Sequence, residues 1–237
     1  MKHAWIIKAL LFFIAYYVVA VAGYEFMAAH ALNPPANLST PVDEAIPFIS
    51  WFAVPYVFLF YPFILGAVGY FSLVRPEKAN RFFAALFGMY AVSYLTYFVF
   101  PVAMSRPDPS TLPGDFLSQV MANFYRSDPP LNCFPSLHAA SSTLAAYFLS
   151  KEVRSKALKA FVWGVAASVI LSTLFVRQHV IADEVAGFAV AYAVSYLAER
   201  KIGLGEAVGS YFRLRVAVTA VLVGVFSAFM IYPLLPI

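Results

Sequence analysis

The chain contains 237 residues, of which 62% are hydrophobic and 12% are charged, and its mean hydropathy is +0.77. These values exclude an ordinary soluble domain and are typical of a multi-spanning membrane protein. The formal net charge of +4 gives no sign of nucleic-acid binding, because the basic residues sort with the loops between apolar segments.

Seven segments without Asp, Glu, Lys or Arg follow one another along the chain, at residues 9–24, 45–74, 82–105, 129–150, 160–176, 185–198 and 216–237. A bilayer core of about 30 Å requires about 20 helical residues, so four of these segments span it alone and three need their flanks. The sequence therefore predicts an all-α polytopic membrane bundle of about seven transmembrane helices. We expect a single membrane-embedded domain over residues 1–237, with the motifs in a core at about residues 82–198.

The basic residues predict the orientation of these helices. With the N-terminus in the cytoplasm, 13 of the 16 Lys and Arg residues lie on the cytoplasmic side. The other three, Arg106, Arg126 and Arg177, fall in external loops. We expect an integral protein of the plasma membrane whose functional site faces the extracytoplasmic side. Lys2 and Lys8 before an apolar run also resemble a signal peptide, but a retained helix is the favoured interpretation.

The first histidine motif, at residues 134–142, reads FPSLHAASS and lies at the outer end of the fourth apolar segment. Pro135 suits the first position of a helix. The backbone N–H groups of Ser136, Leu137 and His138 would then point outward at the positive end of the helix dipole. With the Ser136 hydroxyl as a further donor, they predict an anion site. A capped helix start with an interfacial histidine explains the same residues without catalysis.

The second histidine motif places His179 four residues before Asp183. This spacing lets a carboxylate one helical turn away hold the imidazole in one orientation. An oriented imidazole can act as a nucleophile or as a base. The alternative is a partly buried histidine that only satisfies its hydrogen bonds at a helix end. Arg177 beside the pair, and Arg106 and Arg126 on the same side of the membrane, favour a phosphate site.

A zinc site is a second possible use of the same groups. His138, His179 and Asp183 are acceptable zinc ligands, and three protein ligands leave one coordination position open. Against this arrangement, the chain has no short metal-binding spacing, and a carboxylate one turn from a histidine serves equally as an orienting group. We therefore expect neither a metal nor another cofactor, and sensitivity to a chelator would distinguish the two arrangements.

A proton-coupled transporter is the alternative from another class, because His and Asp side chains within the membrane relay protons in such proteins. The ionisable residues of this chain cluster at the outer ends of the predicted helices instead of at the midplane, and no inverted repeat is visible in the sequence. These two features favour an enzyme over a transporter.

The motifs resemble the three signatures of the type-2 phosphatidic acid phosphatase superfamily, over roughly residues 100 to 190. They are Arg106-Pro107, Pro135-Ser136-Leu137-His138, and Ser172 followed by His179 and Asp183. Three positions depart from the family pattern: Val99 stands in place of Lys, Leu137 in place of Gly and Thr173 in place of Arg. The Ser-Leu-His variant is most similar to the branch of the inositol phosphorylceramide synthases, which transfer a phosphorylated head group between lipids.

The resemblance implies a six-helix core of the phosphatase type and a metal-independent lipid phosphatase or phosphotransferase. It implies that His179 is the nucleophile that forms a phosphohistidine, that Asp183 orients it, and that His138 protonates the leaving group. Phosphate contacts are then expected from Arg106, Ser136, Leu137, Arg177 and Arg126. The implied partners are a lipid phosphate and the bilayer, and either water or an alcohol can accept the phosphoryl group.

Overall fold

The computed structural model describes residues 4–201, 231–232 and 235, and these residues form helices and loops without a β-strand. The α-helices are α1 (Ala4–Tyr17), α2 (Tyr24–His30), α3 (Pro41–Glu44), α4 (Phe60–Gly69), α5 (Ala79–Val99), α6 (Phe116–Ser127), α7 (Leu137–Glu152), α8 (Lys156–Phe175) and α9 (Ile181–Lys201). Shorter π or 3₁₀ segments are η1 (Val18–Gly23), η2 (Ser50–Phe52), η3 (Val54–Leu59), η4 (Tyr70–Val74) and η5 (Pro109–Thr111). Segment η1 joins α1 and α2 into one continuous span.

Among the described residues, five spans are long and apolar enough to cross a membrane: Leu10–His30, Ser50–Val74, Ala79–Val99, Lys156–Phe175 and Ile181–Arg200. They confirm the predicted helical membrane bundle. The fourth predicted segment forms α7, whose 16 residues extend about 24 Å. It is short because Ser136 and Val153 at its two ends have extended backbones. The seventh predicted segment lies almost entirely outside the described residues.

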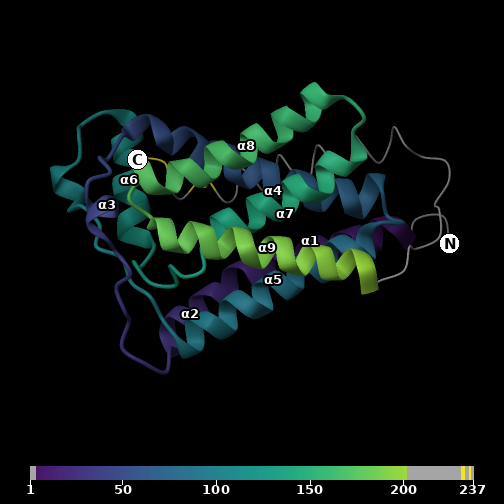
Figure 1. Ribbon diagram of the computed structural model, residues 1–237, viewed down its shortest axis with the longest axis horizontal. Coiled ribbons are helices and arrows are strands. Elements are labelled where there is room, and N and C mark those ends of the chain that lie inside the picture. Colours follow the sequence, from purple (N-terminus) through teal and green to yellow (C-terminus); the bar gives the residue numbers. More distant parts are fainter. Residues whose placement is uncertain (1–3, 202–230, 233–234, 236–237) are drawn as a thin grey trace.

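Helix α7 lies at the centre of the bundle, where it packs against α4, α5, α8 and α9 (Figure 1). Residues 139–146 are all buried, so this helix has no face left for solvent or lipid. Most of these residues are Ala, Ser or Thr, whose small side chains let neighbouring helix backbones approach closely. The first turn of α7, which carries the first histidine motif, is therefore held on several sides.

Gly187 of α9 is the closest approach between the two motif-bearing helices. A Cβ atom at this position would lie 2.4 Å from the backbone oxygen of Ser136 and 3.0 Å from the Cβ of Ala139. Backbone atoms cannot move aside as a flexible side chain can, so only glycine allows this approach. The position thereby sets the spacing between the first turns of α7 and α9.

We expect Gly187→Ala to destabilise the protein and to lower its activity, because the added methyl group forces α9 away from α7. Overpacking of this kind costs about 1–3 kcal/mol. The matched control is Gly164→Ala in α8, where an added Cβ has no atom within 4 Å. Thermal unfolding in detergent should show a lower Tm for the first variant and no loss for the second. An equal Tm for both variants would contradict the close packing.

The two histidine motifs lie at the same end of the bundle. The spans alternate in direction, so residues 31–49, 100–136 and 176–180 gather at one end, with α3 and α6 at the left of Figure 1. The loops of the opposite end are short, at residues 75–78 and 153–155. This arrangement brings the two histidine motifs, which are about 40 residues apart in sequence, to one end of the bundle.

Helix α6 covers this end and was not expected from the sequence, which predicts only a proline-containing loop there. Asp115 caps it by accepting hydrogen bonds from the N–H groups of Leu117 and Ser118 at 3.0 and 3.1 Å. On the inner face, Phe124 packs edge-to-face against Tyr56 of η3, with ring centroids 5.1 Å apart. The helix thus closes the bundle above the motif residues.

Candidate active site

His138 lies in the first turn of α7, and the start of that turn differs from the sequence prediction. The helix begins at Leu137, because Ser136 has an extended backbone and caps the helix by accepting a hydrogen bond from the Ala139 N–H at 3.2 Å. Pro135 therefore precedes the helix and is not its first residue. The N–H groups of Leu137 and His138 have no hydrogen-bond partner within the described part of the chain.

Ser136 joins the two motifs but does not line the cavity described below. Its N–H donates to the backbone oxygen of Asp183 at 3.0 Å, so this group is not free for an anion as the sequence analysis expected. Its hydroxyl is fully buried and serves as the helix cap. The serine thus positions the start of α7 against the start of α9.

The imidazole of His138 lies between aromatic rings and the second histidine. Its ring centroid is 4.6 Å from that of Tyr56 and 4.4 Å from that of Phe60. The ring of His179 lies 5.6 Å away in an edge-to-face arrangement. The two predicted histidines therefore meet, and one phosphate group between them can contact both rings.

His179 makes the contact with Asp183 that their spacing predicted. Nδ1 of His179 lies 3.3 Å from Oδ2 of Asp183, which also accepts a hydrogen bond from the Val180 N–H at 3.0 Å. Asp183 is fully buried, and these contacts hold its Oδ2 in place. Because Nδ1 faces the carboxylate, Nε2 is the ring nitrogen left for chemistry.

The surroundings of His179 shift its pKa in two directions. Burial disfavours the charged imidazole and lowers the pKa, but the hydrogen bond with Asp183 and the nearby Glu184 carboxyl outweigh it and raise the pKa above 6.5. The imidazolium form is therefore favoured at neutral pH, compared with an ordinary histidine. The ring must lose this proton before Nε2 can attack.

Arg106 reaches the same place from the loop after α5. Its Nη1 donates to the backbone oxygen of Asp128 at 2.6 Å, and its Nη2 lies 3.0 Å from Oδ2 of the same residue. Tyr24 of α2 donates its hydroxyl to Oδ1 of Asp128 at 3.0 Å. Burial raises the pKa of Asp128, against the opposing effect of the Arg106 charge. The guanidinium is thus held in place by a largely buried carboxyl, and its Nε has no partner among the described residues.

Arg177 lies outside the site, although it is only two residues from His179. Its backbone has a positive φ of 52°, and its Nη1 donates to the backbone oxygens of Asp43 and Ile46, in the loop before η2, at 2.5 and 3.1 Å. The Asp43 carboxylate in turn accepts a hydrogen bond from the Ile181 N–H at 2.8 Å. Arg177 and Asp43 therefore hold the loop before η2 against the start of α9.

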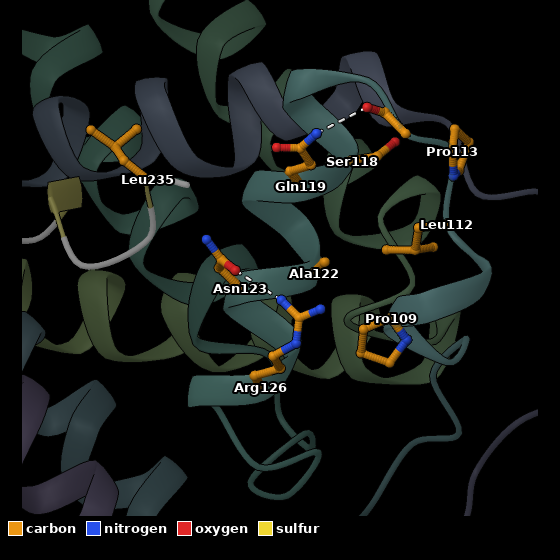
Figure 2. Close-up of a pocket in the computed structure, with 10 residues that line it drawn as sticks. Pro109, Leu112, Pro113, Ser118, Gln119, Ala122, Asn123, Arg126 and Leu235 are labelled. Atoms are coloured by element: carbon orange, nitrogen blue, oxygen red, sulfur yellow. Dashed lines mark hydrogen bonds between the residues drawn. The ribbon is translucent and has the colours of Figure 1, made fainter. Parts of the chain in front are cut away.

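Arg126 also lies elsewhere. It is exposed at the last turn of α6, where its Nη1 donates to Oδ1 of Asn123 at 2.9 Å. It lines a separate hollow between α6 and the loop at residues 109–114 (Figure 2). Of Arg106, Arg126 and Arg177, only Arg106 is brought to the histidines, because Arg126 bonds to Asn123 within α6 and Arg177 bonds to the loop before η2.

A cavity of about 320 Å³ joins the histidines to the apolar interior. Its polar end is lined by Arg106, Asp128, Leu137, His138, Gln178 and His179. Away from the histidines it is lined by Tyr16, Ala20, Val21, Tyr61 and Tyr90, whereas Phe60 lies beside His138. The cavity thus has one end suited to an anion and one end suited to a hydrocarbon.

Sequence reasoning missed several polar residues at the site. Asp128 and Tyr24 lie far from the motifs in sequence, and no spacing rule links them to Arg106. Gln178 is 2% exposed, lines the cavity beside His179 and has an Nε2 without a partner in the described chain. The sequence signal that could have identified Gln178 as a site residue was its position next to His179.

Glu184 is a second buried carboxyl behind His179. Thr173 donates its hydroxyl to Oε1 of Glu184 at 2.8 Å. Thr173 stands where the resembled family has Arg, so this substitution places a neutral donor against the carboxyl. Ser172 beside it donates within α8 to the backbone oxygen of Val169 at 2.6 Å.

No group of three or more His, Cys, Asp or Glu residues in the described chain is arranged to hold a metal ion. Cys133 is buried at the polar end of the cavity, and burial raises the pKa of its thiol to about 12. The zinc arrangement of His138, His179 and Asp183 that the residue types allowed is therefore not assembled.

Comparisons with known proteins give one match. Residues 82–202, just over half of the chain, match the family model described as the PAP2 superfamily. No curated protein and no solved structure matches the chain. The matched segment contains both histidine motifs and Arg106, whereas Tyr16, Tyr24 and the rest of the first span lie outside it.

Proposed function

We propose a phosphate ester of a lipid as the substrate of this chain, which belongs to the PAP2 superfamily. Membership indicates phosphatase or phosphotransferase activity on phosphate esters, and the helical spans make the chain an integral membrane protein. The observation that carries the proposal is the meeting of His138 and His179 at the polar end of a cavity whose other end is aromatic and apolar.

The proposed reaction has two steps. Nε2 of His179 attacks phosphorus in line with the leaving oxygen, a P–N bond forms, and the P–O bond to the leaving group breaks. His138 gives its proton to the departing oxygen. In the second step water or an alcohol attacks the phosphohistidine, His138 takes the proton of the attacking group, and the P–N bond breaks. Asp183 keeps its contact with Nδ1 throughout and stabilises the charged ring.

Positive charge around the phosphate oxygens is the second requirement of such a reaction. Arg106 is the guanidinium that lines the cavity, and the unpartnered N–H groups of Leu137 and His138 stand at the start of α7. These groups support phosphoryl transfer without a metal. The positive-inside distribution of Lys and Arg supports a site on the extracytoplasmic face.

Head-group transfer is a second candidate, and the pairing of Arg106 with Asp128 favours it. This carboxyl offsets the one guanidinium of the cavity, while Val99 and Thr173 replace two cationic residues of the family pattern. A site with so little net positive charge favours a singly charged phosphodiester over a doubly charged phosphomonoester. A phosphodiester donor is what a head-group transferase uses.

Product analysis tests the proposal and separates its two forms. Purified protein is given labelled phosphatidate or labelled phosphatidylinositol, with and without diacylglycerol or ceramide as an alcohol acceptor, in buffer containing EDTA. We expect turnover that EDTA does not reduce, and acceptor-dependent turnover identifies a transferase. Inhibition by EDTA that zinc reverses would contradict the metal-independent mechanism. Ion flux in liposomes that survives His179→Ala would support a transporter instead.

A further inference from the structure

The first span, which lies outside the family-matched segment, contributes much of the apolar end of the cavity. Tyr24 of this span holds Asp128 at the polar end. Tyr16, eight residues earlier and about 12 Å deeper along the helix axis, lines the other end. Ala20 and Val21 line the cavity between them. One helix thus extends along the whole length of the cavity.

Two aromatic rings line the cavity deep in the bundle. The ring of Tyr16 meets that of Tyr90 from α5 edge-to-face, with centroids 6.2 Å apart. Both tyrosines are at most 4% exposed. Ser141 of α7, one turn below His138, also lines the cavity and lies beside Tyr90. The histidines and this tyrosine pair therefore line the same cavity, and the tyrosines line it deeper in the bundle.

We propose that this apolar end binds a hydrocarbon chain of the lipid whose phosphate reacts at His179, and that the first span sets the chain length that fits. The inference rests on the proposed function and deepens it. The occupant follows from continuity: a phosphate held between the two histidines has its ester oxygen at the mouth of an apolar space. An ordinary water-soluble phosphate ester has no group to fill that space.

In this proposal Ala20 determines the width of the cavity, and the tyrosine pair limits the length of the hydrocarbon chain that fits. A larger side chain at Ala20 narrows the cavity below the histidines without touching them. Each methylene that enters the cavity contributes about fourfold to kcat/KM, so the benefit of a long chain grows with its length until the chain reaches Tyr16 and Tyr90. Beyond that length, further methylenes add nothing.

The test measures kcat/KM of the full-length protein for alkyl phosphates of increasing chain length, as monophosphates and as methyl phosphodiesters. We expect the wild type to improve with chain length and then level off. Ala20→Phe should lose at least tenfold with long chains and keep its activity with the shortest one. The matched control is Val18→Phe on the same span, where the side chain is 53% exposed and faces away from the cavity.

Ala20→Leu replaces the larger substitution if Ala20→Phe does not fold, and the wild-type series needs no variant at all. Turnover that is independent of chain length, or an equal loss at every length in Ala20→Phe, would overturn the inference and leave the proposed function intact. Absence of turnover at every length would overturn both. Equal effects of Ala20→Phe and Val18→Phe on long chains would also overturn the inference, because only the first position lines the cavity.

Discussion

His179→Ala is expected to abolish turnover, with a loss of about 10⁴-fold or more, because the proposed covalent intermediate forms on Nε2 of this ring, which Asp183 orients. Release of product from a labelled lipid phosphate measures the effect. The matched control is His30→Ala, since His30 is exposed at the end of α2, where it contacts the backbone oxygen and the ring of Phe26. Activity of His179→Ala within tenfold of the wild type would end the proposed mechanism.

Asp183 provides an internal check on the same reaction. Asp183→Ala should keep a small residual activity, because the imidazole of His179 is then misoriented but still present. Asp183→Asn removes the contact that raises the pKa of His179, so the ring loses its proton at lower pH. The acid limb of kcat/KM, where activity falls as His179 becomes protonated, should therefore move to lower pH in this variant. An unchanged acid limb would assign it to a different group.

Arg106→Ala is the second prediction with a large effect, and we expect kcat/KM to fall about 10²–10³-fold. The guanidinium is the one cationic side chain among the described residues that line the cavity, apart from the histidines. Arg106→Lys should recover little, because an ammonium cannot keep both contacts to Asp128 and also face the phosphate. Steady-state kinetics with phosphatidate and phosphatidylinositol measure the loss.

Arg126→Ala is the matched control for this prediction, since Arg126 is an exposed arginine of the same membrane side outside the cavity. It should behave like the wild type with both substrates. A loss equal to that of Arg106→Ala would show that the arginines at this end of the bundle act through general charge and not through contact. Asp128→Asn should raise the activity toward the phosphomonoester relative to the phosphodiester, because it removes the charge that offsets Arg106.

The pair of His179 and Asp183 shows which part of the site the local sequence could predict. The spacing of His179 and Asp183 is a property of one helical turn, and their contact is present in the structure. Helix α6 shows the opposite case. Its residues follow a stretch that contains several prolines, and although its apolar residues recur at helical spacing, only the tertiary structure shows that this face packs against η3.

The arginines show why residue type and predicted membrane side did not predict which of them line the cavity. Arg177 is closest to His179 in sequence, yet its backbone has a positive φ and its guanidinium donates to Asp43 and Ile46. Arg106 is far from both histidines in sequence and still lines their cavity. Side-chain direction in loops depends on turn conformation and on distant partners, which neither hydropathy nor spacing encodes.

The sequence by itself determined the helical membrane bundle, the common end of the two histidine motifs and the family. Each of these follows from runs of apolar residues or from short spacings, which act along the chain. Only the tertiary structure decided that Asp128 and Tyr24 hold Arg106, that Gly187 sets the spacing of α7 and α9, and that the first span completes the cavity. These contacts join residues from separate helices and loops, so they arise when the helices pack and are not visible in any single segment.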